Sequence, residues 1–256
     1  MSKQTQQFYD QLAGDYHLIF ADWKKSVQRQ GVILDKLIKK QGFKLSSKLL
    51  DCSCGIGTQT IGLALQGYEV QGTDLSPKSI ARAKKEAKNF GVEIKFQPAD
   101  FRKLSQVIKD QFEIVITCDN SLPHLLTDKD LALAIKNIYK TMAPNGLLIA
   151  SIRDYDTLLK EKPTVTPVTI YGKGDNHYFS FQEWSWDEKK PIYSLNHFVV
   201  KKQKNSWKTE CRNTRYRAIK RAELTKFLKA EGMSSITWHM PEETGYYQPI
   251  VTAKKR

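Results

Sequence analysis

The sequence predicts an α/β protein with a doubly wound, mostly parallel seven-stranded sheet and an antiparallel β insertion after the fifth strand. Three observations favour this fold. Five short apolar runs alternate with helical patterns, a segment rich in aromatic and β-branched residues follows them, and the chain ends in an amphipathic helix and two strand-like segments. Strands separated by stretches of roughly 10–15 residues imply right-handed crossovers and a parallel sheet that is covered on both faces.

The five apolar runs and the segments between them define the core in order. Strands are expected within residues 48–53, 68–74, 92–100, 112–120 and 147–154, and helices within 58–67, 76–91 and 127–146, with a short helical piece after residue 100. Ser76 before Pro77 is a typical N-cap, and Thr127 precedes acidic residues of a first turn. The Pro-Asn-Gly sequence at 144–146 is expected to end the third helix.

The remaining segments complete the predicted domain organisation. Residues 23–41 form a helical pattern with Val32, Ile33, Leu37 and Ile38 as its apolar residues. Residues 163–218 alternate as antiparallel strands do, and 221–232, 234–240 and 246–255 are expected to be a helix and two closing strands. We therefore divide the chain into an N-terminal helical segment (1–42), a ligand-binding α/β core (43–156), a β insertion that shapes the substrate site (157–218) and a C-terminal helix with a closing hairpin (219–256).

Composition and charge limit the function classes. The start of the chain is polar, without a secretory signal pattern, and no apolar run reaches the roughly 18 residues of a membrane-spanning helix. The cysteines, Cys52, Cys54, Cys118 and Cys211, lack metal-ligand spacing, and thiols that look buried and unpaired are typical of a reducing cytoplasm. We therefore expect a cytoplasmic protein without a membrane partner or a metal.

The net charge of +14 raises the question of a nucleic-acid partner. The basic residues are spread along the whole chain, which favours a solvated basic surface over a dedicated binding face. A nucleic-acid partner is possible but not favoured, and the sequence leaves the oligomeric state open.

The turn between the first two predicted strands carries the clearest functional pattern. Asp51 ends the first apolar run, Gly55 and Gly57 lie in the turn "CSCGIG", and Asp74 ends the second run. In an open parallel sheet, ligands bind outside the carboxyl ends of the strands, near the point where the strand order reverses. Glycine allows the backbone to turn tightly and to approach a ligand.

Two ligands compete for this turn. A dinucleotide-binding G-x-G-x-x-G motif would need glycine at Thr60, and the Asp51 carboxylate would repel a pyrophosphate. S-adenosylmethionine has an ammonium for Asp51, a ribose diol for Asp74 and no phosphate. Asp100 and Phe101 would then face the adenine with a polar atom and a ring. We favour S-adenosylmethionine, because an ordinary glycine-rich turn does not explain the second acid.

These motifs resemble the class I S-adenosylmethionine-dependent methyltransferases. Residues 49–76 are similar to the first two motifs of that family, and "FEIVITCDNSLPHL" (112–125) to the fourth. The resemblance is strongest to the glycine and glycine/sarcosine N-methyltransferases, through "DNSLPHL" (119–125) and "RDYD" (153–156), and it covers roughly residues 8–160. It implies a Rossmann-like methyltransferase fold, S-adenosylmethionine as cofactor with S-adenosylhomocysteine as product, and methyl transfer to a small amine or amino acid.

The resemblance also implies roles for two catalytic residues. Arg153 would clamp the carboxylate of an amino-acid substrate, unless it forms a structural ion pair with Asp154 or Asp156. Asn120 would orient the amine through its side-chain carbonyl, unless it only shapes the turn after the fourth strand. In-line methyl transfer requires a closely held neutral nucleophile, and no residue cluster predicts a metal site.

Residues near the N-terminus resemble the lid that covers the cofactor in such enzymes. Tyr9, Tyr16 and Trp23 are candidates for contacts to the methionine portion or the sulfonium, although packing of the helix explains them equally well. His124 either lines the cofactor site or caps the following helix. The residues expected to bind the cofactor are Asp51, Gly55, Gly57, Asp74, Leu75, Asp100, Phe101, Cys118, Tyr9, Tyr16, Trp23 and His124.

One departure from the family motif and two rival functions complete the predictions. Asp154 replaces the asparagine of the family's "RNYD" and adds a negative charge beside Arg153, which argues against glycine itself as the acceptor. The basic surface favours an RNA or protein methyltransferase as an alternative, but "DNSLPH" differs from the "NPPY" that grips a flipped base. A non-catalytic S-adenosylmethionine-binding module is the second alternative, which Asn120 and Arg153 disfavour. The aromatic residues Tyr171, Tyr178, Trp184 and Trp186 and the tail at 242–249 are candidates for the wall of the substrate site, although core packing explains most of these rings better.

Overall fold

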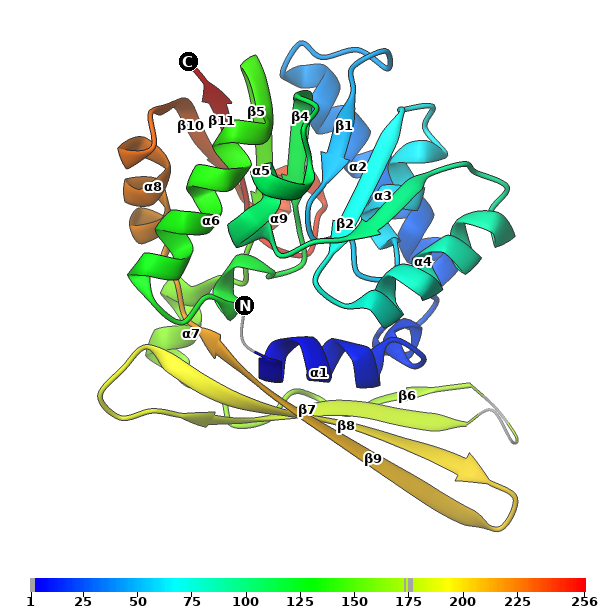
Figure 1. Cartoon of the computed structure of the whole chain (residues 1–256). Helices are drawn as coiled ribbons and strands as arrows, with labels where there is room; N and C mark the ends of the chain where they lie inside the picture. Colours follow the sequence, from blue (N-terminus) through cyan, green and yellow to red (C-terminus); the bar gives the residue numbers. More distant parts are fainter. Residues whose placement is uncertain (1–2, 173, 175–176) are drawn as a thin grey trace.

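A mixed seven-stranded sheet forms the centre of the protein (Figure 1). The computed structural model describes residues 3–172, 174 and 177–256. The sheet has the order β10-β11-β5-β4-β1-β2-β3, which confirms the predicted fold class. Its strands are β1 (Leu49–Asp51), β2 (Val70–Asp74), β3 (Lys95–Pro98), β4 (Phe112–Thr117), β5 (Met142–Ser151), β10 (Met233–His239) and β11 (Ile250–Lys255).

The strand order reverses between β1 and β4, as in other doubly wound sheets. Strands β1 to β5 are parallel, whereas β11 lies antiparallel between β5 and β10. The chain winds from β1 to β3 in one direction and then continues at β4 on the other side of β1. A crevice forms at such a reversal, outside the carboxyl ends of the strands. The topology therefore places the end of β1, with its glycine-rich turn, beside the end of β4.

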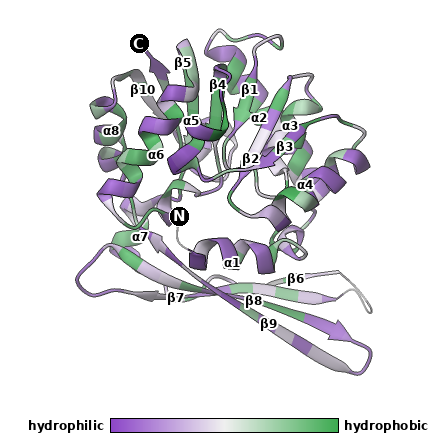
Figure 2. Cartoon of the chain, in the orientation of Figure 1, coloured by the Kyte–Doolittle hydropathy of each residue, from purple (hydrophilic) through white to green (hydrophobic). Residues whose placement is uncertain are grey.

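Helices cover both faces of this sheet. One layer contains α2 (Trp23–Lys40), α3 (Thr58–Ala64) and α4 (Pro77–Asn89), and the other contains α5 (Leu104–Val107), α6 (Asp128–Thr141) and α8 (Arg221–Ala230). Leu49 packs in the core that includes α2, whereas its neighbour Leu50 packs in the core that includes α6 and α8. Ile114 and Val115 alternate in the same way. Both faces of these strands are buried, so the strands read as continuous apolar runs, and Figure 2 colours β1, β4 and β5 mostly hydrophobic.

The two predicted N-caps, of α4 and α6, are confirmed, whereas the predicted end of α6 is wrong. The Ser76 hydroxyl accepts a hydrogen bond from Ser79 N, and the Thr127 hydroxyl accepts one from Asp130 N, as expected of N-caps. Helix α6 already ends at Thr141. The Pro-Asn-Gly sequence therefore lies inside β5, where the pairing with β4 shifts its register.

A second, four-stranded antiparallel sheet follows β5. Its strands β6 (Thr169–Tyr171), β7 (Tyr178–Trp186), β8 (Ile192–Gln203) and β9 (Ser206–Arg217) come after α7 (Tyr155–Glu161). Helix α1 (Lys3–Leu12) lies between the two sheets (Figure 1) and contacts both β9 and α4. The short helices η1 (Tyr16–Ile19), η2 (Phe101–Lys103), η3 (Leu122–His124) and α9 (Pro241–Thr244) lie in the connections.

One local expectation is wrong. Cys211 is exposed on β9, whereas the other three cysteines are buried, because Cys211 occupies a position of the strand that faces solvent. The helix predicted over residues 23–41 is confirmed as α2, with Leu34, Leu37 and Ile38 buried and Val32 exposed. Among the described residues, no helix combines the length and the apolar composition needed to cross a bilayer.

The packing of α2 on α3 depends on two glycines. A Cβ on Gly62 would lie 2.4 Å from the Val27 carbonyl oxygen, and a Cβ on Gly31 would lie 2.3 Å from the Gly62 carbonyl oxygen. We predict that Gly62→Ala lowers the free energy of unfolding by about 1–3 kcal/mol, since overpacking forces the helices apart. Urea unfolding followed by circular dichroism measures this change. Gly14→Ala is the control, because its Cβ would meet no atom within 4 Å. Equal stability of the two variants would contradict the close helix contact.

Candidate functional site

The turn after β1 is shaped by the buried carboxylate of Asp51. Its Oδ1 accepts a hydrogen bond from Ser53 N at 3.2 Å, and its Oδ2 accepts one from Thr60 Oγ1 at 2.7 Å. Burial raises the pKa of Asp51 to about 7. Asp51 is 1% exposed and lies outside the lining of both cavities described below, so it holds the turn from beneath.

Asp74, at the end of β2, faces the same turn from the other side. Its Oδ2 accepts a hydrogen bond from Gly55 N at 2.9 Å, and its Oδ1 accepts one from Ser76 N at 2.8 Å. Each oxygen of an ionised carboxylate accepts two hydrogen bonds, so both oxygens keep acceptor capacity beside these contacts. Burial raises the pKa of Asp74 to about 6. Gly55 has a φ of +53° and no atom within 4 Å of the place of a Cβ, so its backbone borders open space.

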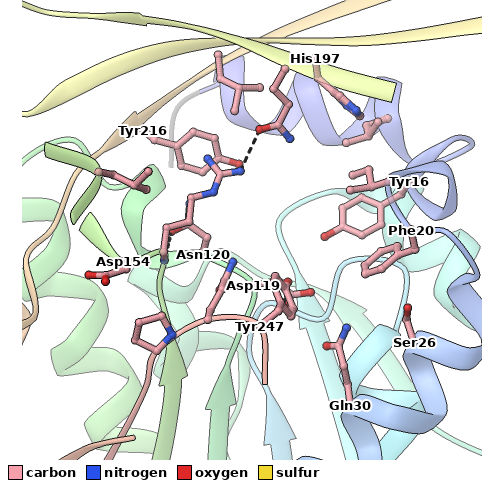
Figure 3. A pocket seen from close by; sticks show the side chains of 18 of the residues that line it. Tyr16, Phe20, Ser26, Gln30, Asp119, Asn120, Asp154, His197, Tyr216 and Tyr247 are labelled. Carbon is pink, nitrogen blue, oxygen red and sulfur yellow. Dashed lines mark hydrogen bonds between the residues drawn. The ribbon is translucent and has the colours of Figure 1, made fainter. Parts of the chain in front are cut away.

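Two adjoining cavities lie at the carboxyl ends of the strands. A narrow cavity over the turn is lined by Tyr9, Tyr16, Cys52, Ser53, Cys54, Gly55, Thr58, Gln59, Asp74, Leu75, Ala99, Phe101, Asp119, Ser121 and His124. A larger cavity of about 600 Å³ extends towards the second sheet (Figure 3). Tyr9, Tyr16 and Asp119 line both cavities. Two ligands, one in each cavity, would therefore meet at the boundary that these three residues form.

The structure brings most of the predicted site residues together. Tyr9, Tyr16, Gly55, Asp74, Leu75, Phe101 and His124 line the narrow cavity, and Asn120 and Arg153 line the larger one. Asp51, Gly57, Trp23, Asp100 and Cys118 line neither cavity.

The residues outside the lining have other contacts. Trp23 is buried and donates its indole N–H to Thr58 Oγ1 at 2.9 Å, so it fixes α2 to α3. The Asp100 carboxylate is bound by the Arg102 guanidinium, with its closest contact at 2.7 Å. Cys118 is buried at the end of β4, where burial raises the pKa of its thiol.

Gly57 has a structural role in the turn. Its φ of +97° lies in the left-handed region that favours glycine. A Cβ at this position would lie 2.8 Å from Ile61 Cδ1. The residue therefore permits the entry into α3.

His124 lines the narrow cavity, and Thr127 caps the following helix instead. The His124 Nε2 and the Tyr9 hydroxyl are 2.8 Å apart, and the imidazole packs on the Tyr216 ring with 4.1 Å between centroids. Burial lowers the pKa of His124 to about 3, so the imidazole is neutral at physiological pH. It positions Tyr9 at the boundary between the cavities.

Arg153 follows β5 and is held by the second sheet. Its Nη1 donates to the Tyr193 hydroxyl at 2.7 Å, and its Nη2 donates to Gln182 Oε1 at 3.1 Å. The guanidinium carbon lies 4.6 Å from the centroid of the Trp184 ring, which is a cation–π contact. These neutral partners orient the guanidinium without neutralising its charge.

The alternative role of Arg153 as the ion-pair partner of its neighbours is wrong. Arg221 binds Asp154 with 2.6 Å between Nη1 and Oδ1, and it binds Asp156 with 3.3 Å between Nε and Oδ2. None of the salt bridges found among the described residues includes Arg153. The positive charge of Arg153 is therefore available to a ligand in the larger cavity.

The side chain of Asn120 is oriented opposite to the expectation. Its Oδ1 accepts hydrogen bonds from Arg153 N at 3.1 Å and from the Tyr155 hydroxyl at 3.0 Å. Its Nδ2 is buried and has no hydrogen-bond partner within the described part of the chain. Since both lone pairs of the carbonyl are used, Asn120 offers a donor to a ligand and not the predicted acceptor.

Several lining residues were not predicted. Asp119, Gln182, His197 and Tyr216 line the larger cavity, whereas Tyr247, which is 47% exposed and also lines it, had been expected there. Asp119 directly precedes Asn120 in the motif at 119–125, so its position in the sequence could have identified it as a site residue. Tyr247 lies in the tail predicted to wall the site. Gln182, His197 and Tyr216 lie on the strands of the insertion, where no motif distinguishes one alternating residue from the next.

Comparison with known proteins agrees with this geometry. A family model described as a methyltransferase domain matches residues 49–146, which contain the turn, Asp74 and the motif after β4. These residues form a methyltransferase domain. The predicted resemblance to this family is therefore confirmed over β1 to β4, including the turn after β1.

The relatives that match about half of the chain include enzymes named as N-methyltransferases of glycine and sarcosine. The chain is 33% identical over 139 residues to a glycine/sarcosine N-methyltransferase of Parasynechococcus marenigrum, covering 54% of this chain and 48% of that protein. It is 33% identical to the glycine N-methyltransferase of Rattus norvegicus, covering 50% and 47% of the two chains. The chain thus spans about half the length of the curated relatives it matches.

Solved structures extend the likeness of fold beyond the methyltransferase domain. An S-adenosylmethionine-dependent methyltransferase from Clostridium acetobutylicum superimposes with a TM-score of 0.75 at 17% identity, covering 96% of this chain and 98% of that one. The S-adenosylmethionine-bound amino pentose methyltransferase CalS10 from Micromonospora echinaspora gives 0.72 at 15% identity, covering 90% and 92%. At these identities the likeness concerns the fold, and it includes the second sheet.

Proposed function

We propose that this protein is an S-adenosylmethionine-dependent methyltransferase that methylates a small carboxylate-bearing amine. The observation that carries the proposal is the Asp74 carboxylate, which keeps acceptor capacity beside Gly55 in a narrow cavity that adjoins a larger one. The methyltransferase domain at 49–146 and relatives named as glycine/sarcosine N-methyltransferases support the same activity.

The residues of the narrow cavity fit S-adenosylmethionine. Asp74 has two oxygens with acceptor capacity for the two hydroxyls of a ribose, and the exposed backbone at Gly55 permits close approach. Phe101 is 3% exposed and lines the cavity after β3, where its ring can pack on adenine. When bound, S-adenosylmethionine supplies an electrophilic methyl group on a sulfonium and leaves as S-adenosylhomocysteine.

The boundary between the cavities suits methyl transfer. Tyr9 and Tyr16 line both cavities, and their aromatic faces favour a neighbouring cation such as a sulfonium. Helix α1 lies between the two sheets, so it covers this boundary and excludes water. In-line displacement then depends on holding the acceptor amine close to the methyl group. We accordingly assign residues 1–42 as the lid and 157–218 as the segment that shapes the acceptor site.

Arg153 and Asn120 provide the binding site for a carboxylate. The guanidinium presents a planar pair of donors that suits a carboxylate, and Asn120 Nδ2 adds a neighbouring donor without a partner among the described residues. Asp154 does not oppose this role, because Arg221 binds its carboxylate. Cavities of about 600 Å³ lie within the range of drug-sized ligands, so the acceptor site has room for more than glycine.

Asp74→Ala is predicted to weaken binding of S-adenosylmethionine about 100-fold or more, because two hydrogen bonds to a charged group are lost at about 1.5–3 kcal/mol each. Isothermal titration calorimetry measures the dissociation constant. Asp100→Asn is the matched control, since the structure directs that carboxylate to Arg102, and we expect its dissociation constant within about threefold of wild type. Equal effects of the two substitutions would contradict the role of Asp74.

Arg153→Lys is predicted to raise the KM for a carboxylated acceptor about tenfold or more, because the ammonium cannot reproduce the planar fork. The affinity for S-adenosylmethionine is expected to stay within about twofold, since Arg153 does not line the narrow cavity. Production of S-adenosylhomocysteine with a panel of amines and amino acids measures the KM. If the KM for every carboxylated acceptor were unchanged, Arg153 would not be the residue that binds the carboxylate.

A further inference from the structure

Asp119 occupies the boundary between the two cavities. It lies two residues after the end of β4 and has a φ of +57°, in the left-handed region that Asp and Asn adopt more readily than other side chains. Its backbone N–H donates to Ser151 Oγ at 2.8 Å. The side chain lines both cavities, so a carboxylate lies where an acceptor nitrogen must approach a methyl donor.

Three neutral donors hold the Asp119 carboxylate. Oδ1 accepts hydrogen bonds from the hydroxyls of Tyr246 and Tyr247 at 2.6 and 2.5 Å, and Oδ2 accepts one from Gln59 Nε2 at 2.7 Å. An ionised carboxylate has about four acceptor sites, so one site on Oδ2 is left. Within the described ranges, no Lys, Arg or His forms a salt bridge with Asp119. The Asp119 carboxylate is held in place by neutral donors, and no cationic side chain among the described residues pairs with it.

The other side-chain carbonyl and carboxylate groups of the larger cavity each accept at least one hydrogen bond from the protein. The Asn120 carbonyl has both lone pairs filled, and Asp154 is bound by Arg221. Gln182 Oε1 accepts from Arg153 and Trp184. Gln30 Oε1 accepts from Gln59, and Gln248 Oε1 accepts from Ser151. The Asp119 carboxylate is therefore the most favourable hydrogen-bond acceptor in the larger cavity for the nitrogen of a methyl-accepting substrate.

The surroundings of Asp119 also suit a cation. Figure 3 shows Asp119 beside Tyr247, with the Tyr16 and Phe20 rings on the facing wall of the cavity. Aromatic faces near a carboxylate add to the attraction for an ammonium group. Burial raises the pKa of Asp119, and the three hydrogen bonds lower it. A bound cation would offset the cost of keeping this carboxylate ionised. The nitrogen must lose a proton before it attacks the methyl group, and the remaining site on Asp119 Oδ2 can accept that proton.

We propose that Asp119 binds the basic nitrogen of the methyl acceptor while Arg153 binds its carboxylate, so that the acceptor is a dipolar amino acid or a close analogue. This inference rests on the proposed function, and it names the residue that takes the role first expected of the Asn120 carbonyl. Asp119 acts as a specificity-determining residue: it selects acceptors with a basic nitrogen over simple carboxylates.

Calorimetric titration with simple probes tests this assignment and does not require the natural acceptor. Acetate carries only the carboxylate, whereas glycine, sarcosine, β-alanine and L-phenylalanine carry both groups. Wild-type protein, with and without saturating S-adenosylhomocysteine, is expected to bind at least one dipolar probe more tightly than acetate. Asp119→Asn is expected to weaken that dipolar probe about tenfold or more and to leave acetate within about twofold.

Two further variants separate contact from charge. Asp154→Asn removes a carboxylate from the same cavity, but one that Arg221 already neutralises, and it is expected to leave both probes within about twofold. Asn tolerates the positive φ of residue 119, so Asp119→Asn should fold, as circular dichroism will show. If it does not fold, Asp119→Glu keeps the charge but displaces it, and the same selective loss of the dipolar probe is expected.

The outcomes distinguish this inference from the proposed function. The role of Asp119 would be overturned if the wild-type protein bound acetate at least as tightly as every dipolar probe. It would also be overturned if the Asp119 variant weakened acetate and the dipolar probe equally, or weakened neither. Failure of S-adenosylhomocysteine to bind contradicts the proposed function instead, and the titrations without it still report on Asp119.

Discussion

The hydrogen bonds of the Asp74 carboxylate hold together the loops on which the site depends. One oxygen binds Gly55 N in the turn after β1, and the other binds Ser76 N at the start of α4. A single side chain thus fixes the distance between the ends of two adjacent strands. Because both contacts are to backbone groups, the carboxylate retains capacity for a ligand between them. The shape of the narrow cavity therefore follows from the pairing of β1 with β2.

The N-terminal segment that contains α1 forms hydrogen bonds to the core on one side and to the second sheet on the other. Asp10 accepts a hydrogen bond from the Ser76 hydroxyl at 2.5 Å, next to the loop that Asp74 organises. On the other side, Arg212 of β9 donates to the Gln11 carbonyl at 3.1 Å and binds Asp15 at 2.7 Å. The second sheet thus supports the N-terminal segment and also supplies the partners of Arg153. The larger cavity, which we propose as the acceptor site, lies where the core, α1 and the second sheet meet.

The sequence predicted well what depends on local patterns. The core strands are buried on both faces and were recognised as continuous apolar runs, and the ends of these runs then identified Asp74 and Gly55 as residues of one edge of the sheet. It failed where a nearby group competes for a side chain. Asp100 was assigned to a ligand, but Arg102 lies two positions away and binds its carboxylate. Asn120 was assigned correctly to the cavity, yet its carbonyl is taken by Tyr155 and by the backbone of Arg153.

The contribution of the second sheet was beyond sequence reasoning for a different reason. The partners of Arg153, Gln182 and Tyr193, lie on β7 and β8, where alternation predicts strands but not which residue faces the cavity. Asp119 has three partners separated from it by 60 to 128 positions along the chain. Only tertiary structure brings such groups together, because no local propensity encodes them.

A crystal structure of the protein with S-adenosylhomocysteine tests the central claim most directly. We predict that the ribose hydroxyls lie within hydrogen-bond distance of the Asp74 carboxylate, and that the sulfur lies at the boundary lined by Tyr9, Tyr16 and Asp119. A ligand bound elsewhere, or bound in the narrow cavity without contact to Asp74, would contradict this claim.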